Sequence, residues 1–141
     1  MIREYTESDL ESVIKIWLDA SVQAHDFVDR NFWQAKADDM RKIYIPKSET
    51  WVYLEDNLIL GFFSLLEDTL AALFVSPNSQ GKGIGQRLIA KAKSLRQSLK
   101  LTVYSENFRS IEFYMKQGFA TVKEQIDEHT GHKEMVMVYN P

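Results

Sequence analysis

A glycine-rich run near the middle of the chain holds the residues with the clearest chemical potential. Residues 80–86 read Gln-Gly-Lys-Gly-Ile-Gly-Gln, with glycines at 81, 83 and 85. Glycine costs conformational entropy, so a fold keeps it where the backbone turns sharply or is approached closely. The run stands between an apolar stretch and a helical pattern, and unpaired N–H groups at a helix start bind anions. It therefore predicts a pyrophosphate site, with a tight turn whose glycines serve packing alone as the alternative.

Two common glycine motifs do not fit this run. A P-loop needs four residues between its first glycine and a Gly-Lys-Ser/Thr triplet, and the sequence has no such arrangement. The dinucleotide fingerprint needs a third glycine or alanine at the position of Gln86. A nucleotide-dependent oxidoreductase is therefore disfavoured, although the loop alone leaves it as an alternative.

A second segment, downstream of the glycine run, has polar, aromatic and glycine residues at a characteristic spacing. Asn107 is followed by Tyr114 and then by Gly118-Phe119. Together with the matches at positions 80, 83 and 85 to the pattern Gln/Arg-x-x-Gly-x-Gly/Ala, this segment resembles the GNAT superfamily of N-acetyltransferases. The resemblance covers about Leu70–Ala120, and within the family it points to the small bacterial acetyltransferases.

The resemblance implies that acetyl-CoA is the cosubstrate. The strand before the glycine loop would pair with the pantetheine arm as an added β-strand does, and the amides of the loop would hold the pyrophosphate. It also implies an amine acceptor, and a homodimer as a frequent assembly. The expected cofactor-binding residues are Leu73, Phe74, Val75, Gln80, Gly81, Lys82, Gly83, Ile84, Gly85, Gln86 and Asn107.

Tyr114 is the residue that the resemblance places beside the cofactor sulfur. The leaving thiolate needs a proton, which a tyrosine hydroxyl bonded to the sulfur can supply, so Tyr114 is predicted to be the general acid. With Ile111 and Met115 it also forms an apolar helical face, and a core tyrosine is the alternative. A backbone N–H of the preceding strand, within residues 73–75, is expected to stabilise the oxyanion.

The general base is less clearly marked. A lysine-like amine has a pKa near ~10.4 and must lose a proton before it attacks. Glu67 and Asp68 stand before the strand that leads to the glycine loop, and either could reach an amine through water; both are also ordinary turn residues. His25 has a suitable pKa, with a capping or surface role as its alternative. Five aromatic residues could wall an acceptor pocket or belong to the core: Trp17, Phe27, Phe32, Trp33 and Trp51.

Composition narrows the classes of function. The chain has 141 residues, of which 45% are hydrophobic and 26% charged, with a net charge of −3, as expected for one domain spanning residues 1–141. Cysteine is absent, which favours direct transfer in a ternary complex, and the scattered histidines do not suggest a metal site. The absence of a basic stripe disfavours nucleic acid. Without a membrane-length apolar run or a signal-peptide core, a cytoplasmic location with no membrane contact is expected.

The elements that position these residues follow from hydrophobic periodicity and turn signals. The order predicts an α/β domain with a mixed, mostly antiparallel sheet of about six or seven strands, flanked by about four helices, with parallel neighbours in its second half. The expected strands cover Met1–Glu4, Trp51–Glu55, Ile59–Glu67, Leu70–Val75, Leu99–Tyr104, Phe119–Asp127 and Lys133–Tyr139. The expected helices run from Thr6, which forms a capping box with Asp9, to about Val22; over Asn31–Tyr44, ended by Pro46; from Gly83; and over Ser110–Gln117.

Three functions fit these observations to different degrees. An active acetyl-CoA-dependent N-acetyltransferase is favoured. A GNAT-like module that holds acyl-CoA with little turnover is the main alternative, and the oxidoreductase is the weaker one.

Overall fold

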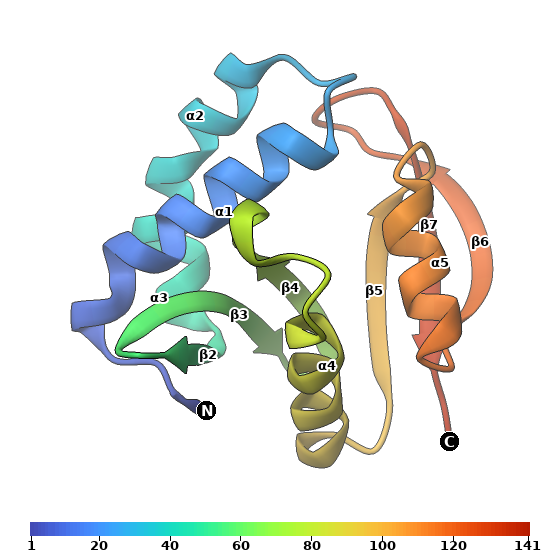
Figure 1. The fold of residues 1–141 in the computed structure, drawn as a ribbon. Coiled ribbons are helices and arrows are strands. Elements are labelled where there is room, and N and C mark those ends of the chain that lie inside the picture. The colour runs from blue at the N-terminus through green and yellow to red at the C-terminus, as the bar shows by residue number, and fades with distance from the viewer.

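Strands and helices alternate along the chain in the expected order, and the computed structural model describes all residues 1–141 (Figure 1). The strands are β1 (Ile2–Glu4), β2 (Glu49–Glu55), β3 (Leu58–Leu66), β4 (Thr69–Val75), β5 (Leu99–Tyr104), β6 (Ala120–Ile126) and β7 (Lys133–Tyr139). The helices are α1 (Leu10–Ala24), α2 (Arg30–Asp39), the short α3 (Ile45–Lys47), α4 (Ile84–Leu95) and α5 (Phe108–Lys116).

The strands form one seven-stranded sheet in the order β1-β2-β3-β4-β5-β7-β6. All neighbours are antiparallel except β4 and β5, which are parallel and pair only at Thr69 and Lys100. Beyond that point the two strands diverge, as Figure 1 shows. The sheet is therefore continuous at the start of β4 and open toward Val75 and Tyr104. We call the gap between β4 and β5 the cleft, and its end near Val75 and Tyr104 the open end of the cleft.

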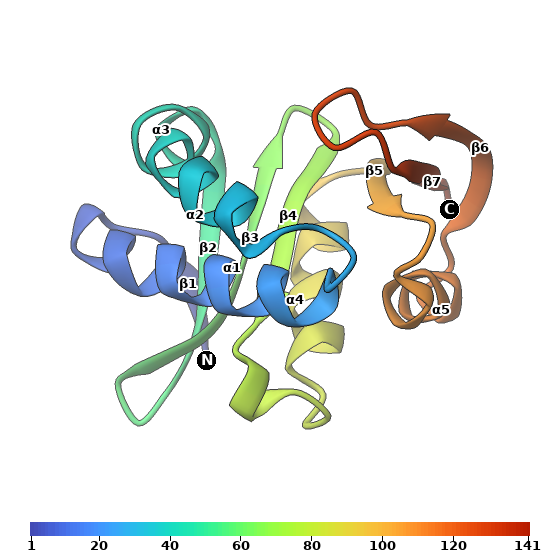
Figure 2. The ribbon, with the colours of Figure 1, turned by 90° about the horizontal axis from the view of Figure 1, so that it is seen from above.

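Alternating side chains of the central strands feed two separate cores, one on each face of the sheet. On β3, Phe62 packs with α1 and α2, whereas its neighbour Phe63 packs with α4 and α5; both rings are fully buried. The cleft between β4 and β5 therefore lies between two layers of helices. Figure 2, seen from above, shows α1–α3 with β1–β4 on one side of the molecule and α5 with β5–β7 on the other.

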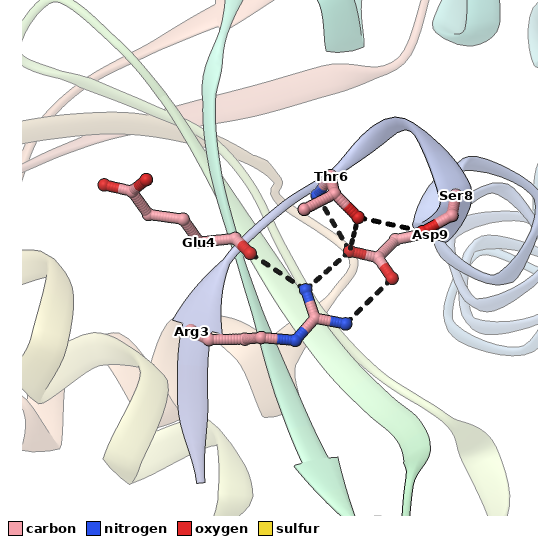
Figure 3. Close-up of polar contacts among 5 residues, drawn as sticks. All are labelled: Arg3, Glu4, Thr6, Ser8 and Asp9. Atoms are coloured by element: carbon pink, nitrogen blue, oxygen red, sulfur yellow. Dashed lines mark hydrogen bonds and ion pairs between the residues drawn. The ribbon is translucent and has the colours of Figure 1, made fainter.

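The N-terminal turn fixes the start of α1. The Thr6 N–H donates to Asp9 Oδ2 at 2.8 Å, and the Asp9 N–H donates to the Thr6 carbonyl. Arg3 on β1 forms a bidentate ion pair with the same carboxylate, at 2.8 and 2.9 Å (Figure 3). This pairing lowers the pKa of Asp9. The expected capping residues are confirmed, although a 3-10 turn at Glu7–Asp9 precedes the helix proper.

The end of the second helical segment differs from the expectation. Pro46 does not end it: α2 continues through a π-helical turn (Met40–Tyr44) into α3, which contains Pro46. In the π turn the Ile45 N–H donates to the carbonyl of Met40, five residues earlier. Proline lacks an N–H and is tolerated in the first turn of a helix, and α3 begins at Ile45. The chain becomes extended only at Ser48.

The second half of the sheet is parallel at one junction only. β4, α4 and β5 form the expected parallel unit, but β7 is inserted between β5 and β6 and is antiparallel to both. The expectation of parallel neighbours is therefore confirmed for β4 and β5 and wrong for β5 and β6. None of the helices combines the length and the apolar composition that a membrane span requires.

Candidate active site

The divergence of β4 and β5 leaves a cavity of about 1340 Å³. It is lined by both strands, by the glycine loop, by the start of α5 and by residues of α1, α2 and the β6–β7 connection. The cavity therefore connects the two faces of the sheet, and a molecule on one face can reach a molecule on the other through the gap.

The free edge of β4 presents main-chain groups to this cavity. The Ser76 N–H donates to the Leu60 carbonyl on β3, and ladder groups alternate along a strand. The N–H and C=O groups of Leu73 and Val75 therefore point away from β3 and toward the gap. The N–H and C=O groups of Phe74 point at β3, so they are not available to a ligand in the gap.

The glycine loop follows directly and leaves its amides unpaired. No N–H from Gln80 to Gln86 donates a hydrogen bond within the protein, and the next amide, Arg87, bonds back to the Gly83 carbonyl at 3.2 Å. Gly81 and Gly83 have φ values of 81° and 82°, which favour glycine. A Cβ built on either residue meets no atom within 4 Å. The loop is thus an open concave run of donors at the N-terminus of α4.

Three features hold the glycine loop and the start of α4 against the sheet. The Gln80 side-chain amide donates to the Val75 carbonyl at 3.2 Å. Gly61 on β3 lets α4 approach, because a Cβ there would lie 3.0 Å from the Phe74 carbonyl oxygen and 3.1 Å from a Leu88 methyl. The Ile84 side chain is buried in the core beneath the loop.

Tyr114 lies on α5 and lines the cavity. Its ring packs edge-on against Phe113 and Phe119, with centroid separations of 5.2 and 5.5 Å, so it also belongs to the core as the alternative interpretation required. Its hydroxyl makes no hydrogen bond to the protein. Burial raises the pKa of Tyr114, so the hydroxyl keeps its proton at neutral pH.

Asn107 and His25 meet at the open end of the cleft. Asn107 Oδ1 accepts a hydrogen bond from the Ser110 N–H at 3.3 Å and so caps α5. Its Nδ2 lies 3.2 Å from Nε2 of His25, and His25 Nδ1 lies 3.0 Å from the Ser21 carbonyl oxygen. Both side chains line the cavity and are buried, and burial lowers the pKa of His25.

Three predicted residues lie away from the cavity. Glu67 and Asp68 form the exposed turn between β3 and β4, at the end where β4 and β5 are paired. Neither lines the cavity, and their carbonyls bond to Arg96 and to the Lys100 N–H, respectively. Lys82 is exposed and does not line the cavity. The structure therefore brings neither of the two carboxylates to the site.

The β6–β7 connection was not predicted to take part. The hydroxyl of Tyr104, at the end of β5, donates a hydrogen bond to the Asp127 carboxylate. The same carboxylate also accepts hydrogen bonds from the His129 N–H and the Thr130 hydroxyl. Asp127, His129 and Glu134 line the cavity with Tyr104. The sequence signalled the hairpin through Thr130-Gly131, but it carried no sign that this hairpin reaches β5. Of the five aromatic candidates, the cavity is lined by Trp17, Phe32 and Trp33.

No group of three or more histidine, aspartate or glutamate residues could hold a metal ion. The site is instead defined by a gap between parallel strands, a free strand edge and a loop of unpaired amides. These features define an α/β domain that can hold an extended ligand with a diphosphate at one end.

Comparison with known proteins identifies the domain. Residues 4–139 match the model of the acetyltransferase (GNAT) domain. The chain is 37% identical over 123 residues to the peptidyl-lysine N-acetyltransferase YiaC of Escherichia coli. The aligned residues make up 86% of this chain and 84% of that protein. It is 30% identical to the peptidyl-lysine N-acetyltransferase YjaB of Salmonella typhimurium, with 90% and 88% covered.

Solved structures agree with the fold. The solution structure of apo YjaB from E. coli superposes with a TM-score of 0.87 at 25% identity, covering 99% of this chain and 96% of that one. The PaiA N-acetyltransferase of Thermoplasma acidophilum, solved with coenzyme A, has a TM-score of 0.83 at 17% identity, covering 100% and 98%. The chain belongs to the GNAT family of acetyltransferases. It is an N-acetyltransferase whose acyl donor is acetyl-CoA.

Proposed function

We propose that the chain acetylates lysine side chains of peptides or proteins, by direct transfer from acetyl-CoA bound across the gap between β4 and β5. The observation that carries this proposal is the continuity of the free β4 edge with the unpaired amides from Gln80 to Gln86. An extended thioester with a diphosphate at its far end matches the polarity of this run of main-chain groups.

The cofactor would lie in two parts. The pantetheine arm would pair with the outward N–H and C=O groups of Leu73 and Val75, as a peptide pairs with a sheet edge. The diphosphate would rest on the amides of the loop, where the positive end of the α4 dipole also favours negative charge. Asn107 would contact the cofactor with the second N–H of its amide, since the first faces His25.

The reaction needs several proton and charge movements. The acceptor ammonium gives one proton to water, and the neutral amine then attacks the thioester carbonyl carbon and forms a C–N bond. The carbonyl oxygen becomes an oxyanion that the N–H of Leu73 or Val75 would stabilise. The C–S bond then breaks, and the leaving sulfur takes the proton of Tyr114, whose raised pKa keeps it protonated at neutral pH. The second proton of the attacking nitrogen, which leaves as the amide forms, passes through water and restores the Tyr114 hydroxyl. The chain has no cysteine to hold an acetyl group.

A lysine acceptor fits the acidic side chains that line the cavity. Asp26, Glu106, Asp127 and Glu134 all line it near α1, α5 and the β6–β7 connection, and these carboxylates would attract a cationic side chain. The relatives YiaC and YjaB are named as peptidyl-lysine N-acetyltransferases. A homodimer and a cytoplasmic location stay predictions from the sequence.

Release of free thiol from acetyl-CoA tests the proposal. The acceptor is a peptide with a blocked N-terminus and one lysine, and the control is the same peptide with Nε-acetyl-lysine. We expect one free thiol for each lysine acetylated. When the peptide is omitted, we expect no acetyl group to become attached to the enzyme itself. Transfer to small amines but not to the peptide would contradict the acceptor assignment. Coenzyme A binding without thiol release would instead support the module with little turnover.

A further inference from the structure

The contact between His25 and Asn107 joins parts of the chain that are 82 positions apart. His25 is the C-terminal cap residue of α1, and Asn107 is the N-terminal cap residue of α5. Their side chains meet at the open end of the cleft, where the β4–β5 ladder no longer exists. Both residues are more than nine-tenths buried, with exposed fractions of 7% and 9%.

The partners of each group fix the direction of the hydrogen bonds. The Ser21 carbonyl can only accept, so His25 Nδ1 carries the proton. Asn107 Oδ1 accepts from the Ser110 N–H, so its Nδ2 faces the ring. In a neutral imidazole Nε2 is then the acceptor, and Asn107 donates to it. The lone pair of His25 is therefore engaged and is not free to remove a proton from an amine.

This hydrogen bond is the one that joins residues 1–95 to residues 96–141 at the open end. The others between these halves lie at the paired end of β4 and β5: Lys100 N–H to Asp68, Arg96 to Glu67 and Glu49, and Lys93 to the Gln117 carbonyl. The open end of β5 is held by aromatic contacts, such as that between the His25 and Tyr104 rings, whose centroids are 5.1 Å apart.

We infer that His25 is a positioning residue: through its Nε2 acceptor it orients the Asn107 cap of α5 and so sets Tyr114 opposite the free edge of β4. Tyr114 follows Asn107 by seven residues, about two helical turns, on the same face of α5. A small rotation at the cap therefore moves the hydroxyl relative to the cofactor sulfur. The inference rests on the proposed role of Tyr114, and it replaces a role for His25 as general base.

Two substitutions separate the two nitrogen atoms of His25. In His25→Asn the side-chain amide can reproduce Nδ1 and donate to Ser21, but nothing reaches Asn107. In His25→Gln the longer side chain can place its oxygen near Nε2 and accept from Asn107. We expect turnover to fall about tenfold in His25→Asn and to recover to within about threefold of the native chain in His25→Gln, with acetyl-CoA affinity changed less than about twofold in both.

A double-mutant cycle tests whether His25 acts through Tyr114. In a Tyr114→Phe background, His25→Asn should lower the remaining turnover by less than about twofold, because the group that it positions is gone. Losses that multiply would overturn the inference, and so would equal losses in His25→Asn and His25→Gln. Thermal unfolding of each variant identifies any that fail to fold, and the comparison is then made with His25→Gln alone against the native chain.

The ring itself gives a readout that does not depend on catalysis. The ¹⁵N shifts of His25 should report a protonated Nδ1 and an unprotonated, hydrogen-bonded Nε2 at neutral pH, with the Nε2 shift altered in Asn107→Ala. The opposite tautomer would overturn the inference even in an active enzyme. If the native chain releases no thiol with any amine, the proposed function fails, and the tautomer still decides whether His25 holds Asn107.

Discussion

The two walls of the cleft are built in different ways. The β4 wall offers main-chain groups: the outward edge of Leu73 and Val75 and the unpaired amides of the glycine loop. The α5 wall offers side chains, Tyr114 and Asn107, which are held by other side chains from distant parts of the sequence. The first wall depends on local backbone shape, whereas the second depends on tertiary contacts. Substitutions of the loop glycines should therefore change cofactor affinity, and substitution of Tyr114 should change turnover.

Tyr114→Phe should give the largest effect on turnover. The substitution removes the hydroxyl but keeps the ring contacts with Phe113 and Phe119, so the fold should be preserved. We expect turnover to fall about 100-fold or more, as for the loss of a general acid, while acetyl-CoA affinity measured by calorimetry changes little. Tyr139→Phe, which removes the hydroxyl of a tyrosine that packs on Phe119 and does not line the cavity, is the control. Native turnover in Tyr114→Phe would remove the proton-donor role.

Gly83→Asp should show the complementary effect on the β4 wall. The carboxylate would face the diphosphate, and we expect acetyl-CoA affinity to fall at least about tenfold. Gly83→Asn is the matched control, because it has a similar size and tolerates a positive φ but carries no charge. Gly131→Asp, at another open positive-φ glycine, controls for backbone strain far from the loop. Equal affinity in the Asp and Asn variants at position 83 would argue against an anion at the loop.

Gly61→Ala should disturb the support of the β4 wall. The new methyl would lie 3.0 Å from the Phe74 carbonyl oxygen on β4 and 3.1 Å from Leu88 on α4, so these neighbours must give way. We expect unfolding in urea to report a loss of about 1–3 kcal/mol, accompanied by weaker acetyl-CoA binding. Gly85→Ala, which meets only the edge of the Phe113 ring at 3.3 Å, should change stability less. An unchanged midpoint in Gly61→Ala would show that the close approach is not required.

The smallest expected effect concerns pH and the α5 wall. Burial lowers the pKa of His25, with the Ser21 carbonyl as a smaller opposing influence. The ring faces no carboxylate directly; it packs on Tyr104, whose hydroxyl bonds to Asp127. As pH falls below ~6.5, His25 takes up a proton in the unfolded chain before it does so in the native one, and stability decreases. The urea midpoint of His25→Gln should therefore fall less with acidification than that of the native chain. Parallel pH profiles would contradict this.

The sequence predicted the β4 wall better than the α5 wall for a physical reason. Glycine spacing, an apolar strand and a helix start are local signals, so the position of the loop between β4 and α4 and the limits of β5 and β7 were predicted correctly. The insertion of β7 between β5 and β6 depends on long-range pairing that no local pattern specifies. The same holds for the contact of His25 with Asn107 and for the bond from Tyr104 to Asp127. The prediction that Pro46 ends the second helix was wrong, because Pro46 lies in the first turn of α3, where a proline is tolerated.

The most direct test of the account is an amide NMR titration with coenzyme A and, separately, with pantetheine, which lacks the diphosphate. We predict that the amide resonances of Gly81, Gly83, Gly85 and Gln86 shift with coenzyme A and stay in place with pantetheine, while those of Leu73 and Val75 respond to both. If coenzyme A binds and leaves the four loop amides unshifted, the central claim that they hold the diphosphate is contradicted.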